Sequence, residues 1–225
     1  MKKLAICLAL VAMATSPAQA AFSLYFGPGN VGIGSAAVNI DYDLMKITLY
    51  ESWTSVAPGI IGFDNEGLAF SGWTLCKIAT NNTGVAWSSF ANELLDLAGD
   101  QNDADFDQAI EAWVPGGYSH SNDQDGLSFN QGGVIPRTSD LFSSVLADEL
   151  GTRDFLDFYD GMVSDGQVVT MSFGLSDNGG SNQPFLLAQR PNEFSETAIP
   201  EPGTMLLLGL GLAGSGLSRR LRRKV

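Results

Sequence analysis

The chain has 225 residues and a formal net charge of −13 at pH 7. Most of the basic side chains lie near the two ends, so segment 21–199 carries 24 acidic residues against 5 basic ones, a balance of −19. Phosphate groups repel such a surface, which argues against binding to nucleic acid or to an anionic lipid face. The 4 Trp, 5 Tyr and 13 Phe residues argue against a disordered chain.

Residues 1–20 have the pattern of a secretory signal peptide. Two lysines precede an apolar run over Leu4–Ala14, and Ala18 and Ala20 form an Ala-x-Ala cleavage site. This order directs a chain to the Sec translocon, and cleavage would leave Ala21 as the first mature residue. The apolar run is too short to span a bilayer. We therefore expect an exported protein.

Segment 21–199 begins as a series of short apolar runs separated by Gly, Asn and Asp, which is typical of β-strands. Lys46–Tyr50 alternates between polar and apolar residues. Leu68–Ala79 and Val85–Phe90 flank an Asn-Asn-Thr-Gly turn and predict a hairpin. Cys76, the one cysteine outside the signal peptide, is expected to be a buried thiol without a disulfide. Trp53 lies in a polar stretch and is expected to be the most exposed tryptophan.

The middle of this segment contains one predicted helix. Asp103–Val114 places Phe106, Ile110 and Trp113 at helical spacing, begins with acidic residues and ends before Pro-Gly-Gly. Acidic side chains are favourable at a helix N-terminus and proline and glycine stop the helix, so the pattern predicts a short helical insertion.

The polar stretch that follows is a candidate calcium loop. Residues 121–126 read Ser-Asn-Asp-Gln-Asp-Gly, which places the carboxylates of Asp123 and Asp125 two residues apart before a glycine. Oxygen ligands at alternate positions resemble part of an EF-hand loop, but position 132 is Gly where the EF-hand needs Glu, so only a looser calcium site is predicted. His120, the single histidine, is expected to be solvated. No catalytic residue can be assigned, because no nucleophile motif accompanies it.

Three further patterns complete the predicted domain. Ser139–Gly151 reads either as a second helix or as a strand over Leu141–Leu146. Gln167–Leu175 shows the clearest strand alternation, and Pro184–Gln189 predicts the last strand. Together the elements predict a mainly β domain, a β-sandwich of the Ig-like or jelly-roll type with one or two short helical insertions.

The final 26 residues have three dissimilar parts. A rigid joint of Pro200, Glu201 and Pro202 comes first. Residues 204–218 are fifteen uncharged residues, and as a helix they would rise about 22 Å, short of a hydrocarbon core of about 30 Å. The end is basic, and by the positive-inside rule it would stay on the cytoplasmic side; its charged residues are Arg219, Arg220, Arg222, Arg223 and Lys224.

This tail resembles the PEP-CTERM sorting signal of Gram-negative bacteria, a tail type that is also labelled an ice-binding protein C-terminal domain. Gly203 departs from the Ser or Thr usual at that position, but Thr204 follows directly. The resemblance implies recognition by exosortase, a membrane protease-transpeptidase, and co-occurrence with exopolysaccharide production. It also implies transient anchoring in the inner membrane. A permanent anchor made of the same helix is the alternative.

Three parts are therefore expected: a signal peptide (1–20), an exported β-sandwich body (21–199) and a sorting tail (200–225). The predicted function is that of a non-enzymatic surface or matrix protein associated with exopolysaccharide or biofilm. The alternative is a secreted hydrolase of polysaccharide that uses a carboxylate pair not identifiable in so acidic a chain. Ice binding lacks support, because the sequence has no Thr-x-Thr ladder.

Overall fold

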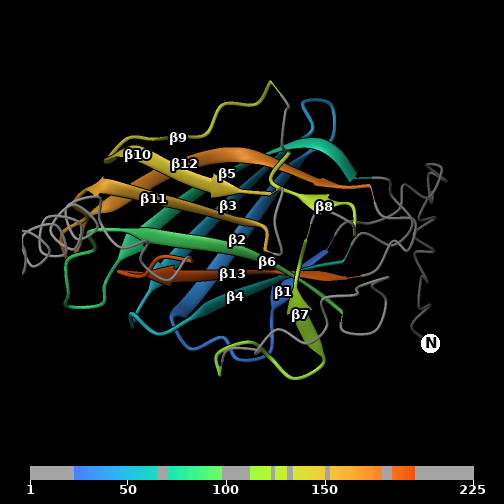
Figure 1. Ribbon diagram of the computed structural model, residues 1–225. Helices are drawn as coiled ribbons and strands as arrows, with labels where there is room; N and C mark the ends of the chain where they lie inside the picture. The colour runs from blue at the N-terminus through green and yellow to red at the C-terminus, as the bar shows by residue number, and fades with distance from the viewer. Residues whose placement is uncertain are drawn as a thin grey trace, which may run out of the picture.

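The computed structural model describes residues 23–64, 70–97, 112–122, 125–130, 134–149, 153–178 and 184–195. Within these ranges the chain forms thirteen strands in two sheets and no helix. Figure 1 shows the two sheets facing each other around a common core. This mainly β, two-sheet arrangement is consistent with the predicted β-sandwich.

The first sheet, sheet A, has seven strands. Its central path is β1 (Ser23–Phe26), β4 (Gly59–Asp64), β13 (Phe185–Pro191), β6 (Phe90–Leu97), β11 (Phe155–Gly161) and β10 (Phe142–Asp148). A short strand, β7 (Tyr118–His120), pairs with the end of β6 beyond the residues that pair with β11. All of these pairings are antiparallel.

The second sheet, sheet B, has six strands. Its path is β2 (Ile33–Asp41), β3 (Lys46–Trp53), β5 (Phe70–Asn81), β12 (Val168–Asp177) and β8 (Leu127–Ser128), and β9 (Thr138–Ser139) also pairs with β12. The pairing of β3 with β5 is parallel, and the other pairings in this sheet are antiparallel.

The core between the sheets follows from the alternation of side chains along the strands. In β12 the inward residues Val169, Met171, Phe173 and Leu175 have no exposed surface. In β3 the inward residues Ile47 and Leu49 are likewise buried. The strands predicted over 46–50, 167–175 and 184–189 are therefore confirmed.

A second, smaller apolar cluster lies on the other face of sheet A. It contains Ile60, Leu95, Leu186, Ala188 and Val114, and Trp113 and Tyr118 pack against it. Segment 113–118 therefore covers part of the outer face of this sheet. As a result, β13 is buried along its whole length.

The predicted hairpin after Leu68–Ala79 is wrong. Strand β5 belongs to sheet B and β6 to sheet A, so the chain crosses between the sheets at residues 82–89. The amide of Asn81 donates to the carbonyls of Val85 (2.8 Å) and Val163 (2.9 Å) and so fixes the crossing. Trp87 then pairs with Val163 as an isolated bridge.

Two burial predictions are also wrong. Trp53 is fully buried, because its indole N–H donates to the Glu51 carboxylate (3.1 Å) and its ring meets Trp87 and Phe90 edge-on. Cys76 is only half-buried, because its register places it on the outer face of sheet B, while Leu75 and Lys77 point inward.

For the segment 139–151, the strand interpretation is confirmed and the helix interpretation is wrong, since β10 occupies its described residues. The Ser139 hydroxyl accepts from the N–H groups of Leu141 and Phe142 in a turn that leads into this strand. The helix predicted over Asp103–Val114 lies, up to residue 111, outside the described residues. The signal peptide and the sorting tail also lie outside them.

Candidate functional site

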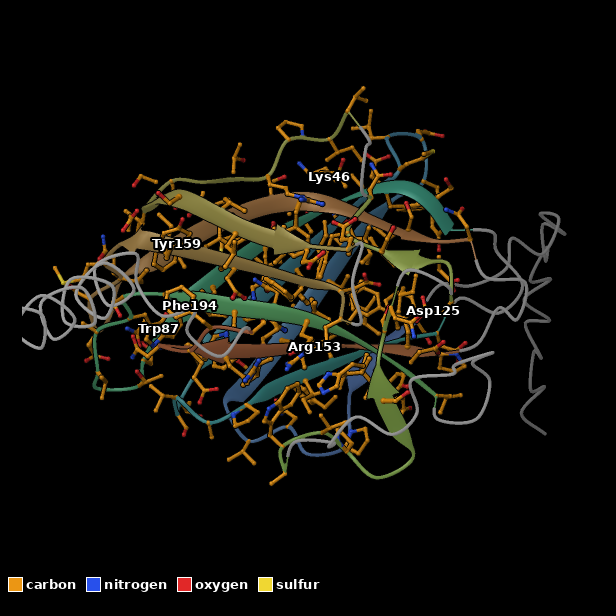
Figure 2. All side chains as sticks on the ribbon, viewed as in Figure 1. Lys46, Trp87, Asp125, Arg153, Tyr159 and Phe194 are labelled. Carbon is orange, nitrogen blue, oxygen red and sulfur yellow. The ribbon has the colours of Figure 1, made fainter. Side chains whose placement is uncertain are left out.

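The predicted calcium loop is described only in part, because Asp123 lies outside the described residues. The Asp125 carboxylate accepts from the N–H groups of Asn122 (3.0 Å) and Leu127 (2.9 Å) and from the Ser121 hydroxyl (3.3 Å). Burial raises the pKa of Asp125, against these hydrogen bonds. Figure 2 shows Asp125 in the right-hand part of the view and Arg153 nearer its middle. Its contacts are those of a carboxylate that shapes a turn.

No metal centre is formed by the residues with described positions: they include no group of three His, Cys, Asp or Glu side chains arranged to hold an ion. Calcium binding near Asp123 and Asp125 therefore stays a prediction.

His120 is buried, with 7% of its surface exposed, and the expectation of a solvated histidine is wrong. Its Nδ1 lies 2.7 Å from Oε1 of Glu93, a fully buried carboxylate on β6. The same Glu93 oxygen accepts from Nε of Arg153 (2.6 Å), and the other oxygen accepts from Arg190 (3.0 Å). We name these four residues the Glu93 cluster.

Three strands bring the Glu93 cluster together. Glu93 and Arg190 project from β6 and β13 on the outer face of sheet A, His120 ends β7, and Arg153 lies just before β11. The Arg190 guanidinium lies 4.2 Å from the centre of the Trp113 ring, which covers it. Both carboxylate oxygens of Glu93 are thus engaged by cations inside the protein, an arrangement that supports the packing of segment 113–120 onto the sheet.

A second polar group lies in the core between the sheets. Lys77 of β5 faces Glu51 of β3, Gln189 of β13 and Asn92 of β6, and all four side chains are buried. The Lys77 ammonium lies 3.5 Å from the Glu51 carboxylate and 3.3 Å from Oδ1 of Asn92. It also contacts Oε1 of Gln189. We name these four residues the core polar cluster.

The sequence contained a signal for the core polar cluster that its interpretation missed. Lys77 occupies an inward position in the alternation Trp73, Leu75, Lys77, Ala79, and Glu51 does so between Leu49 and Trp53. A charged residue in register with core residues indicates a buried partner, because an unpaired buried charge is very costly.

The described surface contains an apolar cavity of about 120 Å³. It lies between the edge strands β1 and β2, and the residues that line it are Leu24, Tyr25, Phe26, Ala36, Ala37, Val38, Leu49 and Ile61. No carboxylate is among these lining residues. The cavity therefore lacks the facing pair of acids that hydrolysis of a polysaccharide needs.

The tail matches a known family motif. Residues 198–223 match the PEP-CTERM protein-sorting motif. The PEP-CTERM match includes Pro200, Glu201 and Pro202 and the arginines of the basic end, with Lys224 directly after it. It confirms the resemblance drawn from these residues. No curated protein and no solved structure matches the chain.

The PEP-CTERM motif marks the chain as a substrate of exosortase, exported with a C-terminal tail that is held transiently in the membrane. Over the part of the chain that the structure describes, no helix is long and apolar enough to cross a membrane. The matched motif lies outside that part.

Proposed function

We propose that the protein is a non-enzymatic surface or matrix component of a Gram-negative bacterium, delivered by exosortase and associated with exopolysaccharide or biofilm. The observation that carries the proposal is the PEP-CTERM motif, which begins at residue 198, shortly after the described body ends at residue 195. The motif accounts for export and sorting, and its usual co-occurrence with exopolysaccharide production points to the matrix.

The body supports the non-enzymatic part of this proposal. Two of its buried acids, Glu51 and Glu93, are engaged by internal cations, and the cavity between β1 and β2 is lined by apolar side chains. A glycoside hydrolase needs two carboxyl groups that face each other across a space open to substrate, about 5–9 Å apart. The alternative of a secreted hydrolase needs such a pair beside an open cleft, and the cavity between β1 and β2 has no carboxylate among its lining residues.

Processing of the tail is the first test. The intact mass of the protein is measured after export from cells with exosortase and from cells without it. We expect Ala21 as the N-terminus and loss of the segment after the Pro200-Glu201-Pro202 joint in the first case only, and Glu201→Gln tests whether the one charge of the joint is read. If Arg222 and Lys224 persist in cells with active exosortase, the tail is a permanent anchor and the sorting proposal fails.

Matrix association is the second test. The exported protein is sedimented with exopolysaccharide from the same cells, and release of new reducing ends is measured in parallel. Co-sedimentation without new reducing ends supports the matrix proposal. Steady release of reducing ends that continues after repurification would favour the hydrolase instead.

A further inference from the structure

The core polar cluster joins the two sheets at their centres. Lys77 lies in the middle of β5 in sheet B, and Glu51 lies on the neighbouring strand β3 of the same sheet. Gln189 and Asn92 come from the opposite sheet, where they are directly paired residues of β13 and β6. The Lys77 side chain therefore crosses the core and places its amine against two carboxamides and one carboxylate.

The surroundings of the Lys77 amine are apolar and aromatic. Its nitrogen lies 3.8 Å from the centre of the Phe90 ring and 6.0 Å from that of Trp53. Neither Lys77 nor Glu51 has an exposed side chain. Burial lowers the pKa of Lys77 to about 8, against the attraction of Glu51. A neutral amine, which is the nucleophilic form, is thus accessible at low energetic cost.

Glu51 contacts both the amine and one of the two amides. Its Oε2 lies 3.5 Å from the Lys77 nitrogen, and its Oε1 accepts a hydrogen bond from the Gln189 amide nitrogen at 2.7 Å. The Gln189 carbonyl oxygen in turn contacts the Lys77 nitrogen. An amine, an amide and a carboxylate that bridges them are the parts that acyl transfer from an amide to an amine requires.

We propose that Lys77 and Gln189 form an intramolecular isopeptide bond inside the core, with Glu51 as the proton-transfer group. The reaction exchanges one amide for another and releases ammonia, so it needs neither an oxidant nor an external acyl donor. It goes beyond the sorting function proposed above and is independent of it.

The steps balance as follows. The Lys77 ammonium gives one proton to the Glu51 carboxylate, and the neutral amine attacks Cδ of Gln189 to form the new C–N bond. Protonated Glu51 then gives its proton to the departing amide nitrogen, and the old C–N bond breaks. A remaining proton of the former amine passes to Glu51, so the products are a secondary amide, free ammonia and a neutral Glu51. No uncompensated charge is left in the core.

The orientation of Asn92 separates its role from that of Gln189. The Asn92 amide nitrogen donates to the carbonyl of Leu156 at 2.9 Å, so it has a backbone partner, and its oxygen faces the Lys77 nitrogen at 3.3 Å. Of the two carboxamides, Gln189 is the one whose nitrogen is hydrogen-bonded to Glu51. Asn92 is therefore a positioning residue that orients the amine.

The bond would act as a covalent tie in a chain that lacks an internal disulfide. Once the signal peptide is removed, Cys76 is the only cysteine, whereas the residues joined here are 112 positions apart in the sequence. Closing so long a loop restricts the unfolded chain in the way a disulfide does, and an amide bond does not depend on the redox state outside the cell.

The test is the mass of the exported protein under denaturing conditions, followed by peptide mapping. We expect the intact protein to be lighter than its sequence by one ammonia, and digestion to give a branched peptide that joins the segment of Lys77 to that of Gln189. In Glu51→Gln the ammonia is retained and the branched peptide is lost. The matched control Glu193→Gln changes an exposed acid and should still show both the loss of one ammonia and the branched peptide.

Measurements on the wild-type protein alone can refute the proposal. The test therefore does not depend on whether the Glu51→Gln variant folds. A full sequence mass, with the Lys77 amine open to acylation after denaturation, refutes the bond. A branch that maps to Asn92, or an ammonia lost elsewhere in the chain, refutes the assignment of Gln189. None of these results bears on processing of the tail, so the two proposals fail separately.

Discussion

Replacement of Glu93 by Gln should destabilise the body strongly. Glu93 is fully buried and is the shared anion of His120, Arg153 and Arg190. Glutamine keeps the size of the side chain but removes the charge, and so leaves Arg190, which has 5% of its side chain exposed, without its buried counter-ion. The packing of segment 113–120 on sheet A depends on these contacts.

The size of the effect follows from the burial. Removing one partner of a buried ion pair costs about 3–5 kcal/mol, because the remaining charge keeps its desolvation penalty. With a urea m-value of about 2 kcal/mol/M, the unfolding midpoint should fall by about 1.5–2.5 M at an unchanged slope. Urea unfolding of the exported protein, followed by tryptophan fluorescence, measures this shift.

Glu193→Gln is the matched control, since Glu193 binds the same Arg190 at 2.9 Å but is 52% exposed. An exposed pair contributes about 0–1 kcal/mol, so this variant should shift the midpoint by less than about 0.5 M. Equal shifts in the two variants would show that burial of Glu93 does not set the strength of the cluster, and the reasoning would be refuted.

Two further predictions concern carboxylates of the body. Burial raises the pKa of Asp157 to about 6, against hydrogen bonds from Ser195. Between about pH 4 and pH 6 the folded state therefore holds a proton on Asp157 that the unfolded state has lost. The unfolding free energy of the wild type relative to Asp157→Asn is then greatest below about pH 4, and it falls by about 3 kcal/mol as the pH rises to about 6. A flat difference in unfolding free energy across this range would contradict the shift. For the loop at 121–126, calcium should raise the melting temperature of the wild type but not of Asp123→Ala/Asp125→Ala. Asp125→Ala should also melt lower in chelator, because three hydrogen bonds are lost; an equal calcium response in wild type and double variant removes this loop as the site.

The faces of single strands could be read from the sequence, because alternation is a local property. The inward residues of β12 and the early part of β3 were predicted for this reason. The tail was also readable, since a sorting enzyme recognises a linear motif. Both successes rest on residues close to one another in the chain.

Two of the errors have a common cause in partners that are distant in the sequence. Polar neighbours made His120 look solvated, but its partner Glu93 lies on another strand. The Asn-Asn-Thr-Gly sequence after β5 fits both a hairpin within one sheet and a crossing to the other sheet. Here the contacts of Asn81 and Trp87 with Val163 fix the crossing. The pattern of neighbouring residues in the sequence carries no information about these long-range contacts.

The position of β13 sets the order in which the domain is completed. This strand lies between β4 and β6, so without residues 185–191 sheet A is divided into β1–β4 and the strands that begin with β6. Such long-range pairing closes slowly and late. Six residues separate Pro191 from the sorting motif at 198, a reach of about 20 Å when extended. An exported chain can therefore complete sheet A only once residues 185–191 are available, close to the sorting motif that holds its tail in the membrane. Until then sheet A is incomplete, a state prone to aggregation.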